Sequence, residues 1–440
     1  MSEPQDETHE FQADEDFALG LDAEDALGGF RSRFHLPRAP DGRPLPYFAG
    51  NSLGLQPIGV AEAVQRELDD WARLAVDSHF EGASPWYSYH ELLREPAARL
   101  VGALPGEVVM MNGLTVNLHL MLVSFYRPEG SRKLILMEDC AFPSDTYAAE
   151  TQLRYHGQDP ADSLIVARAG DGRSAAGTED IERVLVERGH EIALVLLGGV
   201  NYFTGQVFDM QRITSLAQRK GCVVGLDLAH AVGNVLLQLH DWQVDFAVWC
   251  SYKYLNSGPG AVAGCFVHER HAAQADLPRF GGWWGNDPDR RFRMHLERNF
   301  EPRPGADGWQ LSNPPILSMA PIRVSLALFD EAGMPALRAK SRKLTAYLQY
   351  WIDRSGAGRV EVLTPREPRF RGCQLSLRVL DRPRELFRDL QERGVVADYR
   401  EPDVIRVAPV PLYNSYHDVW SFGQALDGWN RSSAVQEAGP

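Results

Sequence analysis

Between about residues 95 and 270, short apolar runs alternate with amphipathic helical ones, the pattern of a mainly parallel sheet covered by helices. Apolar residues recur at helical spacing over residues 209–220, where Asp209 can cap the start of a helix and Gly221 can end it. The clearest strands are predicted at residues 133–137, 192–197, 223–227, 246–250 and 262–267. We therefore expect an α/β fold.

Beyond about residue 330 the pattern changes to that of a smaller α+β unit. Helices are predicted at residues 334–352 and 383–393, and strands at residues 360–363, 374–379 and 404–408. The expected organisation is a disordered acidic N-terminus (1–25), a segment associated with the small domain (26–60), a large cofactor-binding domain (61–325), a small C-terminal domain (326–428) and a tail (429–440).

The composition is that of an ordinary globular protein, with 44% hydrophobic and 24% charged residues. A formal net charge of −14 argues against a nucleic-acid or anionic-membrane partner. No apolar run reaches the roughly 20 residues of a membrane helix, and residues 1–16 lack the features of a signal peptide. Five cysteines without CxxC spacing favour free thiols and a cytoplasmic location.

A lone lysine, Lys253, follows the predicted strand 246–250, and a carboxylate, Asp227, ends the strand 223–227. Alone, each residue has an ordinary structural explanation: the lysine reaches solvent, and the aspartate caps the next helix. Together they match a pyridoxal phosphate site, in which a lysine amine forms a Schiff base with the aldehyde and an aspartate binds the pyridine nitrogen.

Other polar or aromatic residues stand where such a site needs them. Gly113 and Thr115 precede an apolar helical run, and a helix start is a suitable seat for a phosphate. Phe142 and Asp145 follow a strand directly, at the end where ligands of open α/β sheets bind. Alternatively, Thr115 is a simple helix cap and Phe142 ordinary core packing.

Two further features point to substrate and partner contacts. Trp283 and Trp284, bracketed by glycines, predict a loop that presents large flat surfaces or, alternatively, plugs the domain core. Arg406 lies inside an apolar strand, where its guanidinium requires a carboxylate. That carboxylate belongs either to a substrate or to a structural ion pair.

These residues together resemble the kynureninase family, pyridoxal phosphate hydrolases of the aspartate aminotransferase-like fold type I. The resemblance extends from Tyr47 to Tyr416 and includes the run Ser251-Tyr-Lys-Tyr-Leu-Asn256. It is carried by residues 47–57, 114–117, 141–145, 202–206, 227–234, 251–256, 282–283, 311–316 and 405–414. One departure is Gly198, where some family members have a serine near the cofactor. The resemblance implies a large domain with a mainly parallel seven-stranded sheet sandwiched by helices.

The resemblance also implies roles for individual residues. Lys253 would hold the cofactor and act as general base, Asp227 with Asp145 would keep the pyridine nitrogen protonated, and Tyr252 would shuttle a proton. Phe142 would stack on the cofactor ring, and His230 would lie near the cofactor's oxygen or phosphate. The remaining cofactor contacts would be Leu114, Thr115, Pro143, Ser144, Tyr252, Asn313 and Trp283, the last from a second subunit of a homodimer. The substrate contacts would be Arg406 at the α-carboxylate, His79, Ser312 and Asn313 at the aryl end, and Asn51.

The implied reaction is hydrolysis of the Cβ–Cγ bond of L-kynurenine, and of 3-hydroxy-L-kynurenine, to L-alanine and the anthranilate, a step of tryptophan degradation. Two alternatives remain open. A cysteine desulfurase of the same fold needs a reactive thiol on a flexible loop, but Cys373 lies in a strand-like alternation. A non-catalytic sensor would have no need of the lysine at position 253.

Overall fold

The computed structural model describes residues 10–437 of the 440-residue chain, except residues 171, 273, 275 and 357. The chain divides into two compact units. The smaller unit contains the described parts of Met1–Ile58, Phe203–Val207 and Glu331–Pro440, and the larger unit contains those of Gly59–Tyr202 and Phe208–Asp330. The N-terminal segment therefore belongs to the same unit as the C-terminal residues.

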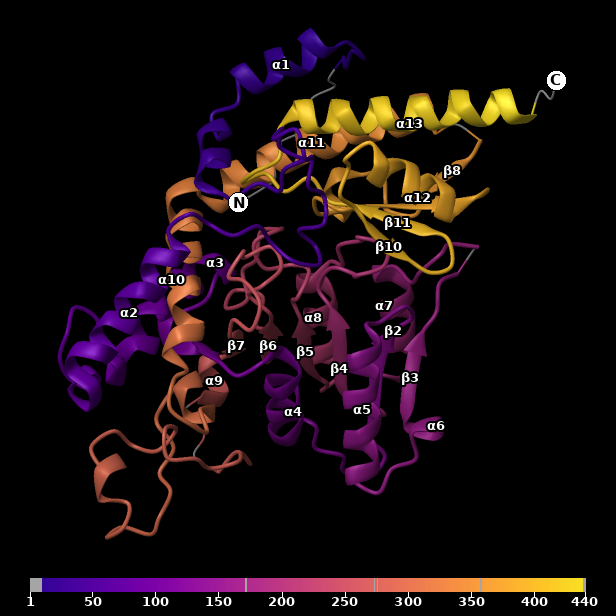
Figure 1. Cartoon of the computed structure of the whole chain (residues 1–440). Coiled ribbons are helices and arrows are strands. Elements are labelled where there is room, and N and C mark those ends of the chain that lie inside the picture. Colours follow the sequence, from indigo (N-terminus) through magenta and orange to yellow (C-terminus); the bar gives the residue numbers. More distant parts are fainter. Residues whose placement is uncertain (1–9, 171, 273, 275, 357, 438–440) are drawn as a thin grey trace. The chain divides into compact units, whose positions relative to one another are not determined.

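The larger unit is built on a seven-stranded sheet with the order β1-β7-β6-β5-β4-β2-β3 (Figure 1). Neighbours from β3 to β6 are parallel, whereas β7 runs antiparallel to both β6 and β1. The strands are β1 (Val108–Met111), β2 (Leu134–Glu138), β3 (Leu164–Ala167), β4 (Ile192–Gly198), β5 (Val223–Asp227), β6 (Phe246–Trp249) and β7 (Ala263–Val267). This mainly parallel sheet confirms the predicted fold class.

Both faces of this sheet are buried. Ile135 and Leu194 share a core cluster with residues of α4 and α5, while Leu136 and Val195, which point to the opposite face, are equally buried. The helices of the unit are α2 (Val60–Leu74), α3 (Arg94–Val101), α4 (Leu114–Phe125), α5 (Pro143–Tyr155), α6 (Pro160–Ser163), α7 (Thr178–Arg188), α8 (Met210–Arg219), α9 (Glu269–Ala272) and α10 (Ile316–Ala332). Because both faces are apolar and buried, polar side chains that can bind a ligand are expected at the ends of the strands.

The sequence predicts five of the seven strands, each with ends within one residue of the observed ones. The helix predicted over residues 209–220 is α8. The Asp209 carboxylate accepts the N–H of Arg212 at 3.0 Å, and Gly221 follows the helix with φ +80°. β1 and β3 are not predicted from the sequence. Each has only four residues and lies at an end of the sheet.

The smaller unit has a four-stranded antiparallel sheet with the order β10-β11-β9-β8. Its strands are β8 (Val360–Val362), β9 (Leu375–Val379), β10 (Asp398–Arg400) and β11 (Val404–Val407), and its helices are α1 (Glu15–Ala23), α11 (Met334–Ser355), α12 (Pro383–Glu392) and α13 (Tyr416–Glu437). Apolar residues of all four helices and of all four strands contribute to one core. This is the α+β unit that the sequence predicts, with β10 as an additional strand.

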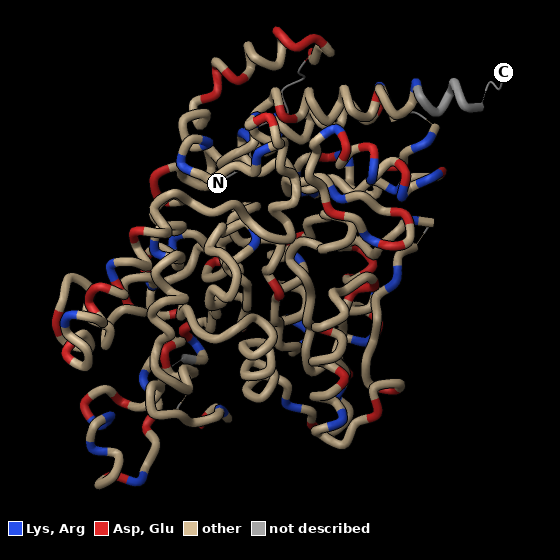
Figure 2. The backbone as a smooth tube through the Cα atoms, in the orientation of Figure 1, with Lys and Arg blue, Asp and Glu red and all other residues tan. Residues whose placement is uncertain are grey.

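The predicted disorder of residues 1–25 is wrong for the part that the structure describes, because residues 15–23 form α1. Asp14 caps this helix by accepting the N–H of Phe17 at 2.8 Å. Acidic residues occupy its first turn (Figure 2), where they complement the helix dipole. Phe17 packs on Tyr347 at a ring separation of 6.0 Å. The acidic composition suggests disorder, but the segment forms a capped helix whose apolar residue Phe17 packs on Tyr347.

Charged residues of both signs are interspersed along the backbone of each unit (Figure 2). Among the residues that the structure describes, no helix combines the length and the apolar character that crossing a membrane requires.

Candidate active site

A cavity lies where parallel strands of the larger unit end. Glu138 ends β2, Gly198 ends β4, Asp227 ends β5, and Lys253 follows β6. Because these strands are parallel neighbours, their carboxyl ends meet at one edge of the sheet. The cavity is lined by Leu114, Thr115, Glu138, Phe142, Asp145, Gly198, Val200, Asn201, Tyr202, Asp227, Ala229, His230, Tyr252 and Lys253. Eight of the predicted site residues therefore share one cavity.

Lys253 projects its amine into this cavity. Its Nζ lies 3.0 Å from Nε2 of His230, and 5.8 Å from the centroid of the Phe142 ring. Phe142 is 44% exposed, so its face is accessible, and Tyr202 contacts it edge-on at a ring separation of 5.2 Å. The amine and the aromatic face are thus placed together beside open space, as a flat aldehyde cofactor requires.

Three carboxyl groups, those of Glu138, Asp145 and Asp227, line the same cavity as the amine, and all three residues are buried. Burial raises the pKa of Asp227, and burial together with the charge of Asp227 raises the pKa of Asp145 well above its usual range. Burial raises the pKa of Glu138 to about 8. Asp227 accepts the N–H of Ala229 at 2.7 Å, whereas Oδ1 of Asp145 is buried without a hydrogen-bond partner among the described residues. The site is therefore built to stabilise a cationic group beside Asp227 and Asp145.

Two helix starts border the same cavity. α4 begins at Leu114, and its N-cap Gly113 provides no side-chain cap, so the first N–H groups of this helix are available to a ligand. Thr115 Oγ1 lies 3.2 Å from Ser144 Oγ on the first turn of α5, which begins at Pro143. Backbone donors and paired hydroxyls at two helix N-termini are suited to a phosphate.

Tyr252 lines the cavity next to Lys253 and is 36% exposed. Burial raises the pKa of Tyr252 to about 12, with a further contribution from the neighbouring Cys250. The phenol is consequently protonated at neutral pH and can donate a proton or a hydrogen bond.

His79 and Asn313 lie apart from this cavity and line a second one in the larger unit. Its other lining residues are Glu67, Trp71, Trp86, Trp284, Pro314, Pro315, Ile316, Leu317 and Ser318. Ser312 Oγ donates a hydrogen bond to Oδ1 of Asn313 at 3.1 Å. Of the three residues assigned to the aryl end of the substrate, His79 and Asn313 therefore line one cavity, and Ser312 is hydrogen-bonded to Asn313.

The sequence predicts that the loop with Trp283 and Trp284 either presents both rings or plugs the domain core, and the structure shows one ring in each situation. Trp284 is buried at 1% exposure, with the Arg291 guanidinium 4.1 Å from its ring centroid. Trp283 packs edge-on against Trp284 at a ring separation of 4.9 Å, and it lines neither cavity. Only Trp283 is therefore available for contacts outside the larger unit.

Asn51 and Arg406 belong to the smaller unit, and both are fully buried. Asn51 donates a hydrogen bond to Gln374 at 3.0 Å. Arg406 forms an ion pair with Asp398 at 2.8 Å and donates a hydrogen bond to Ser52 Oγ at 3.2 Å. The carboxylate that the sequence demands for Arg406 is therefore supplied within the protein, and the substrate role of Arg406 stays a prediction.

Sequence reasoning missed Glu138, Asn201 and Tyr202 as lining residues. Glu138 has a clear signal, since it ends an apolar strand as Asp227 does. Gly198 is explained by its neighbour: its N–H donates a hydrogen bond to Glu138 at 3.1 Å, and a Cβ there would lie 3.1 Å from the same carboxylate oxygen. A glycine at this position accommodates the buried carboxyl.

Solved structures define the class of this fold. A cysteine desulfurase from Thermococcus onnurineus superposes with a TM-score of 0.71 over 88% of this chain and 95% of its own, at 16% identity. A C-DES mutant with glycine covalently linked to its PLP cofactor gives a TM-score of 0.73 over 90% and 99%, at 18% identity. The fold is that of the fold type I pyridoxal phosphate enzymes.

Sequence relatives define the family within this class. The kynureninase of Myxococcus xanthus is 56% identical over 96% of this chain and 98% of its own length. That of Koribacter versatilis is 54% identical over 94% and 97%. The family model described as the kynureninase C-terminal domain matches residues 337–426. The chain belongs to the kynureninase family.

Proposed function

We propose that this protein is a pyridoxal phosphate-dependent hydrolase that cleaves the Cβ–Cγ bond of L-kynurenine to give anthranilate and L-alanine. The observation that carries the proposal is the cavity in which Lys253, Asp227 and Phe142 meet at the carboxyl edge of the sheet. The family relation of the whole chain points to the same activity.

The residues of the cavity fit pyridoxal phosphate. The fit is supported by Asp145 Oδ1, which is buried without a hydrogen-bond partner among the described residues, and by burial of Asp227, which raises the pKa of that carboxyl; a cation beside the two would stabilise their charged forms. The protonated pyridine nitrogen is such a cation. When bound, the cofactor supplies an electron sink conjugated to the substrate's α-carbon. Lys253 would hold it, Asp227 and Asp145 would keep its ring nitrogen protonated, and the start of α4 would bind its phosphate.

Proton transfers are the main task of the side chains around this group. Lys253 would remove the proton from the substrate α-carbon, because its amine lies in the cavity, 5.8 Å from the centroid of the Phe142 ring. His230, 3.0 Å from that amine, can accept a proton from Lys253 Nζ. Tyr252, with its pKa raised to about 12 by burial, would donate a proton to the substrate Cβ as the Cβ–Cγ bond breaks, while water supplies the hydroxyl that Cγ gains.

The proposal is tested by incubating the purified protein and pyridoxal phosphate with L-kynurenine. Stoichiometric L-alanine and anthranilate are the expected products, and absence of both contradicts the proposal. Sulfide release from cysteine would instead indicate a desulfurase, which the structure disfavours because Cys373 is buried. Cofactor binding without any turnover would indicate the sensor alternative.

The proposal includes a homodimer in which the partner subunit contributes to each active site. Partly exposed Trp283 lines neither of the two cavities described above, although the family resemblance assigns it to the cofactor. Phe80 and Phe292, both 60% exposed, contact each other at a ring separation of 6.2 Å, so the larger unit presents an aromatic patch. Exposed aromatic patches are typical of interfaces.

We expect inactive Lys253→Ala and Trp283→Ala chains, mixed in equal amounts after mild dissociation, to recover about a quarter of the wild-type activity, since about half of the random dimers are heterodimers. The reason is that one of the two composite sites then receives both intact residues. Activity and light-scattering mass are measured together. A fully active monomer at low concentration would contradict the dimer.

A second prediction concerns the ring hydroxyl of 3-hydroxy-L-kynurenine. We expect kcat/KM for this substrate to equal or exceed that for L-kynurenine, because the polar His79 and Asn313 can pair with the hydroxyl. His79→Phe should lower kcat/KM for the hydroxylated substrate about tenfold relative to L-kynurenine, equivalent to roughly 1.4 kcal/mol. His190→Phe, at a side chain 72% exposed, is the control. A strong wild-type preference for L-kynurenine that His79→Phe leaves unchanged would refute the assignment.

We also propose that the protein works in the cytoplasm. The support is chemical: all five cysteines are free thiols, and four of them are buried. Free thiols persist in a reducing compartment.

A further inference from the structure

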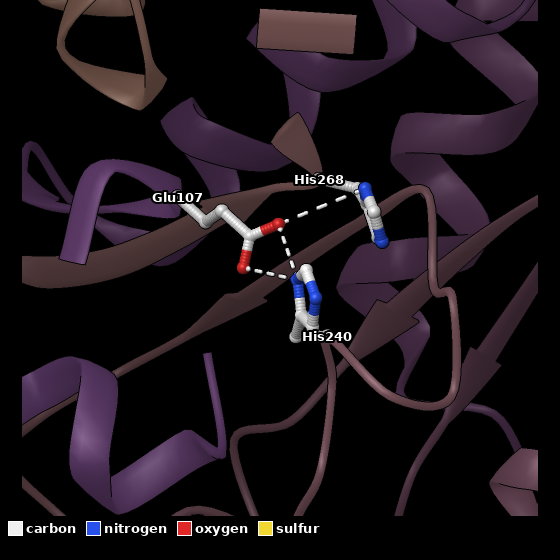
Figure 3. A group of neighbouring side chains, drawn as sticks. All are labelled: Glu107, His240 and His268. Carbon is white, nitrogen blue, oxygen red and sulfur yellow. Dashed lines mark hydrogen bonds and ion pairs between the residues drawn. The ribbon is translucent and has the colours of Figure 1, made fainter. Parts of the chain in front are cut away.

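A second group of chemically active side chains lies at the opposite edge of the large sheet. Glu107 immediately precedes β1, His268 immediately follows β7, and His240 lies in the connection between β5 and β6 (Figure 3). Since β6 begins and β7 ends at this edge, it is the edge away from Lys253. The proposed reaction uses none of these three residues.

The three side chains have the spacing of a metal-binding site. One potential ligand atom from each lies within 4.8 Å of the other two. Glu107 Oε1 is 3.0 Å from His240 Nδ1 and 3.6 Å from His268 Nδ1. Two zinc–ligand bonds of about 2.1 Å at the tetrahedral angle separate their ligand atoms by roughly 3.4 Å. Both measured separations lie close to that value.

The hydrogen bonds of His268 leave its Nδ1 unprotonated. Nδ1 of His268 accepts the backbone N–H of Arg270 at 3.2 Å, so it carries no proton itself, and Nε2 is buried without a hydrogen-bond partner among the described residues. Two unprotonated acceptor atoms, Nδ1 of His268 and Oε1 of Glu107, therefore lie 3.6 Å apart inside the protein. A cation between them would bind both, and at Nδ1 it would take the place of the Arg270 N–H.

Surrounding backbone groups hold the carboxylate in place. Glu107 accepts the N–H of Glu269 at 2.8 Å and the N–H of Leu104 at 2.8 Å. Its side chain is 1% exposed and that of His268 is 4% exposed, whereas His240 is 26% exposed and provides the route of entry. The His240 and His268 rings are stacked, with centroids 5.0 Å apart. Such outer contacts orient ligands for a metal.

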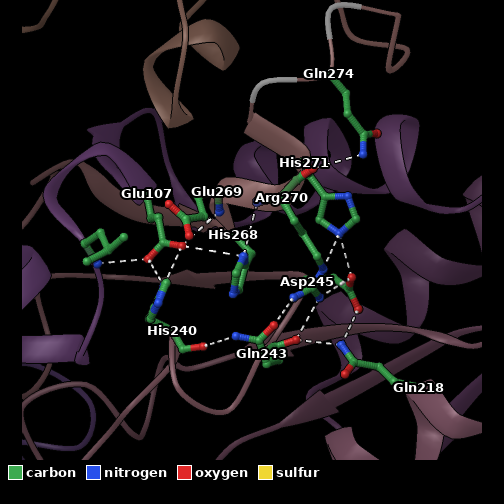
Figure 4. A network of polar contacts seen from close by, with 11 residues as sticks. Glu107, Gln218, His240, Gln243, Asp245, His268, Glu269, Arg270, His271 and Gln274 are labelled. Carbon is green, nitrogen blue, oxygen red and sulfur yellow. Dashed lines mark hydrogen bonds and ion pairs between the residues drawn. The ribbon is translucent and has the colours of Figure 1, made fainter.

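The neighbouring carboxylate shows the contrast. Asp245 lies in the same polar network (Figure 4), but it is fully engaged as an ion pair. Arg270 donates to it at 2.5 Å, His271 lies at 2.6 Å, and the N–H of Val224 donates at 2.8 Å. A permanent guanidinium neutralises Asp245, whereas among the described residues no lysine or arginine forms an ion pair with Glu107, whose partners are His240 and His268.

We propose that Glu107, His240 and His268 bind one divalent transition-metal ion of the zinc type, with water as the fourth ligand. Imidazole nitrogens and one carboxylate are a ligand set that suits Zn²⁺. The ion would join the start of β1, the end of β7 and the β5–β6 connection. Its role is stabilisation, because the site lies at the edge opposite to the catalytic cavity.

The test uses full-length holoenzyme treated with chelator and then titrated with Zn²⁺ against a chromophoric indicator, with metal content measured by mass spectrometry. The variants are His240→Gln, at a partly exposed position where the protein should still fold, and His268→Gln. The matched control is His190→Gln at an exposed histidine. All are made in a Cys140→Ser background, because Cys140 is an exposed thiol that can take zinc.

We expect one Zn²⁺ per chain in the parent and in His190→Gln, and affinity at least 30-fold weaker in both ligand variants. Zn²⁺ should raise the Tm of the parent and leave that of His240→Gln unchanged. Co²⁺ should give the visible absorption of a nitrogen–oxygen site in the parent and in His190→Gln, and in neither ligand variant. Zero stoichiometry, or Zn²⁺ affinity unaffected by His240→Gln and His268→Gln, would overturn the proposal.

Discussion

Replacing Lys253 by alanine is expected to lower kcat/KM for L-kynurenine by a factor on the order of 10³ or more, with the protein still folded. The substitution removes the covalent anchor and the general base together. It also removes a positive charge that lowers the pKa of the buried Asp227 and Asp145. Steady-state rates and the visible absorbance of bound cofactor are the measurements.

Lys253→Arg separates the loss of positive charge from the loss of the covalent anchor and base. It keeps a positive charge near Asp227 but cannot form the covalent link. We expect it to be as inactive as Lys253→Ala. Lys220→Ala is the control, because its Nζ contacts only the carbonyl of Val186 at 3.3 Å. If either Lys253 variant retains wild-type turnover and cofactor absorbance, Lys253 is not the anchor.

The residues at strand ends are the part of the site that a sequence predicts best. A long apolar run followed by a single polar residue identifies both a buried parallel strand and the residue at its carboxyl end. Asp227 and Lys253 are found in this way, and the same rule applied to β2 would have found Glu138. The signal is strong because a charged group at a buried position carries a large desolvation cost.

Pairings between distant segments are the part that the sequence predicts poorly. Arg406 requires a carboxylate, but that this is Asp398 depends on the pairing of β10 with β11, and β10 has only three residues. His79 and Asn313 share a cavity although 234 positions separate them. Their assignment came only from the family resemblance, since no local pattern links them.

The tryptophan pair shows why burial of single residues is hard to predict in loops. Periodicity assigns faces in helices and strands, but a glycine-flanked loop has no period. Trp284 is buried because Arg291 and Tyr87 cover it, and both come from outside the loop. The acidic start of the chain is a similar case, because Phe17 becomes ordered by contact with Tyr347 on α11.

Asp227→Asn is expected to lower kcat by about 10²–10³, a typical cost of losing a charge-stabilising group in an active site. The amide cannot keep the cofactor's ring nitrogen protonated. In the cofactor-free protein the same substitution should instead be favourable, because it should raise the stability of the fold at neutral pH. Burial raises the folded-state pKa of Asp227, so its contribution to stability is present at low pH and is lost as pH rises through that pKa.

The cofactor-free Asp227→Asn variant should therefore have a higher Tm than cofactor-free wild type at pH 7, and the difference should shrink toward pH 4. Thermal melts at several pH values, with and without pyridoxal phosphate, measure both effects, and Asp162→Asn at an exposed position is the control. Such opposite changes would mean that the buried carboxylate is retained for chemistry at the expense of stability. Unchanged kcat, or a variant less stable than wild type without cofactor at pH 7, would show that Asp227 has a structural role instead.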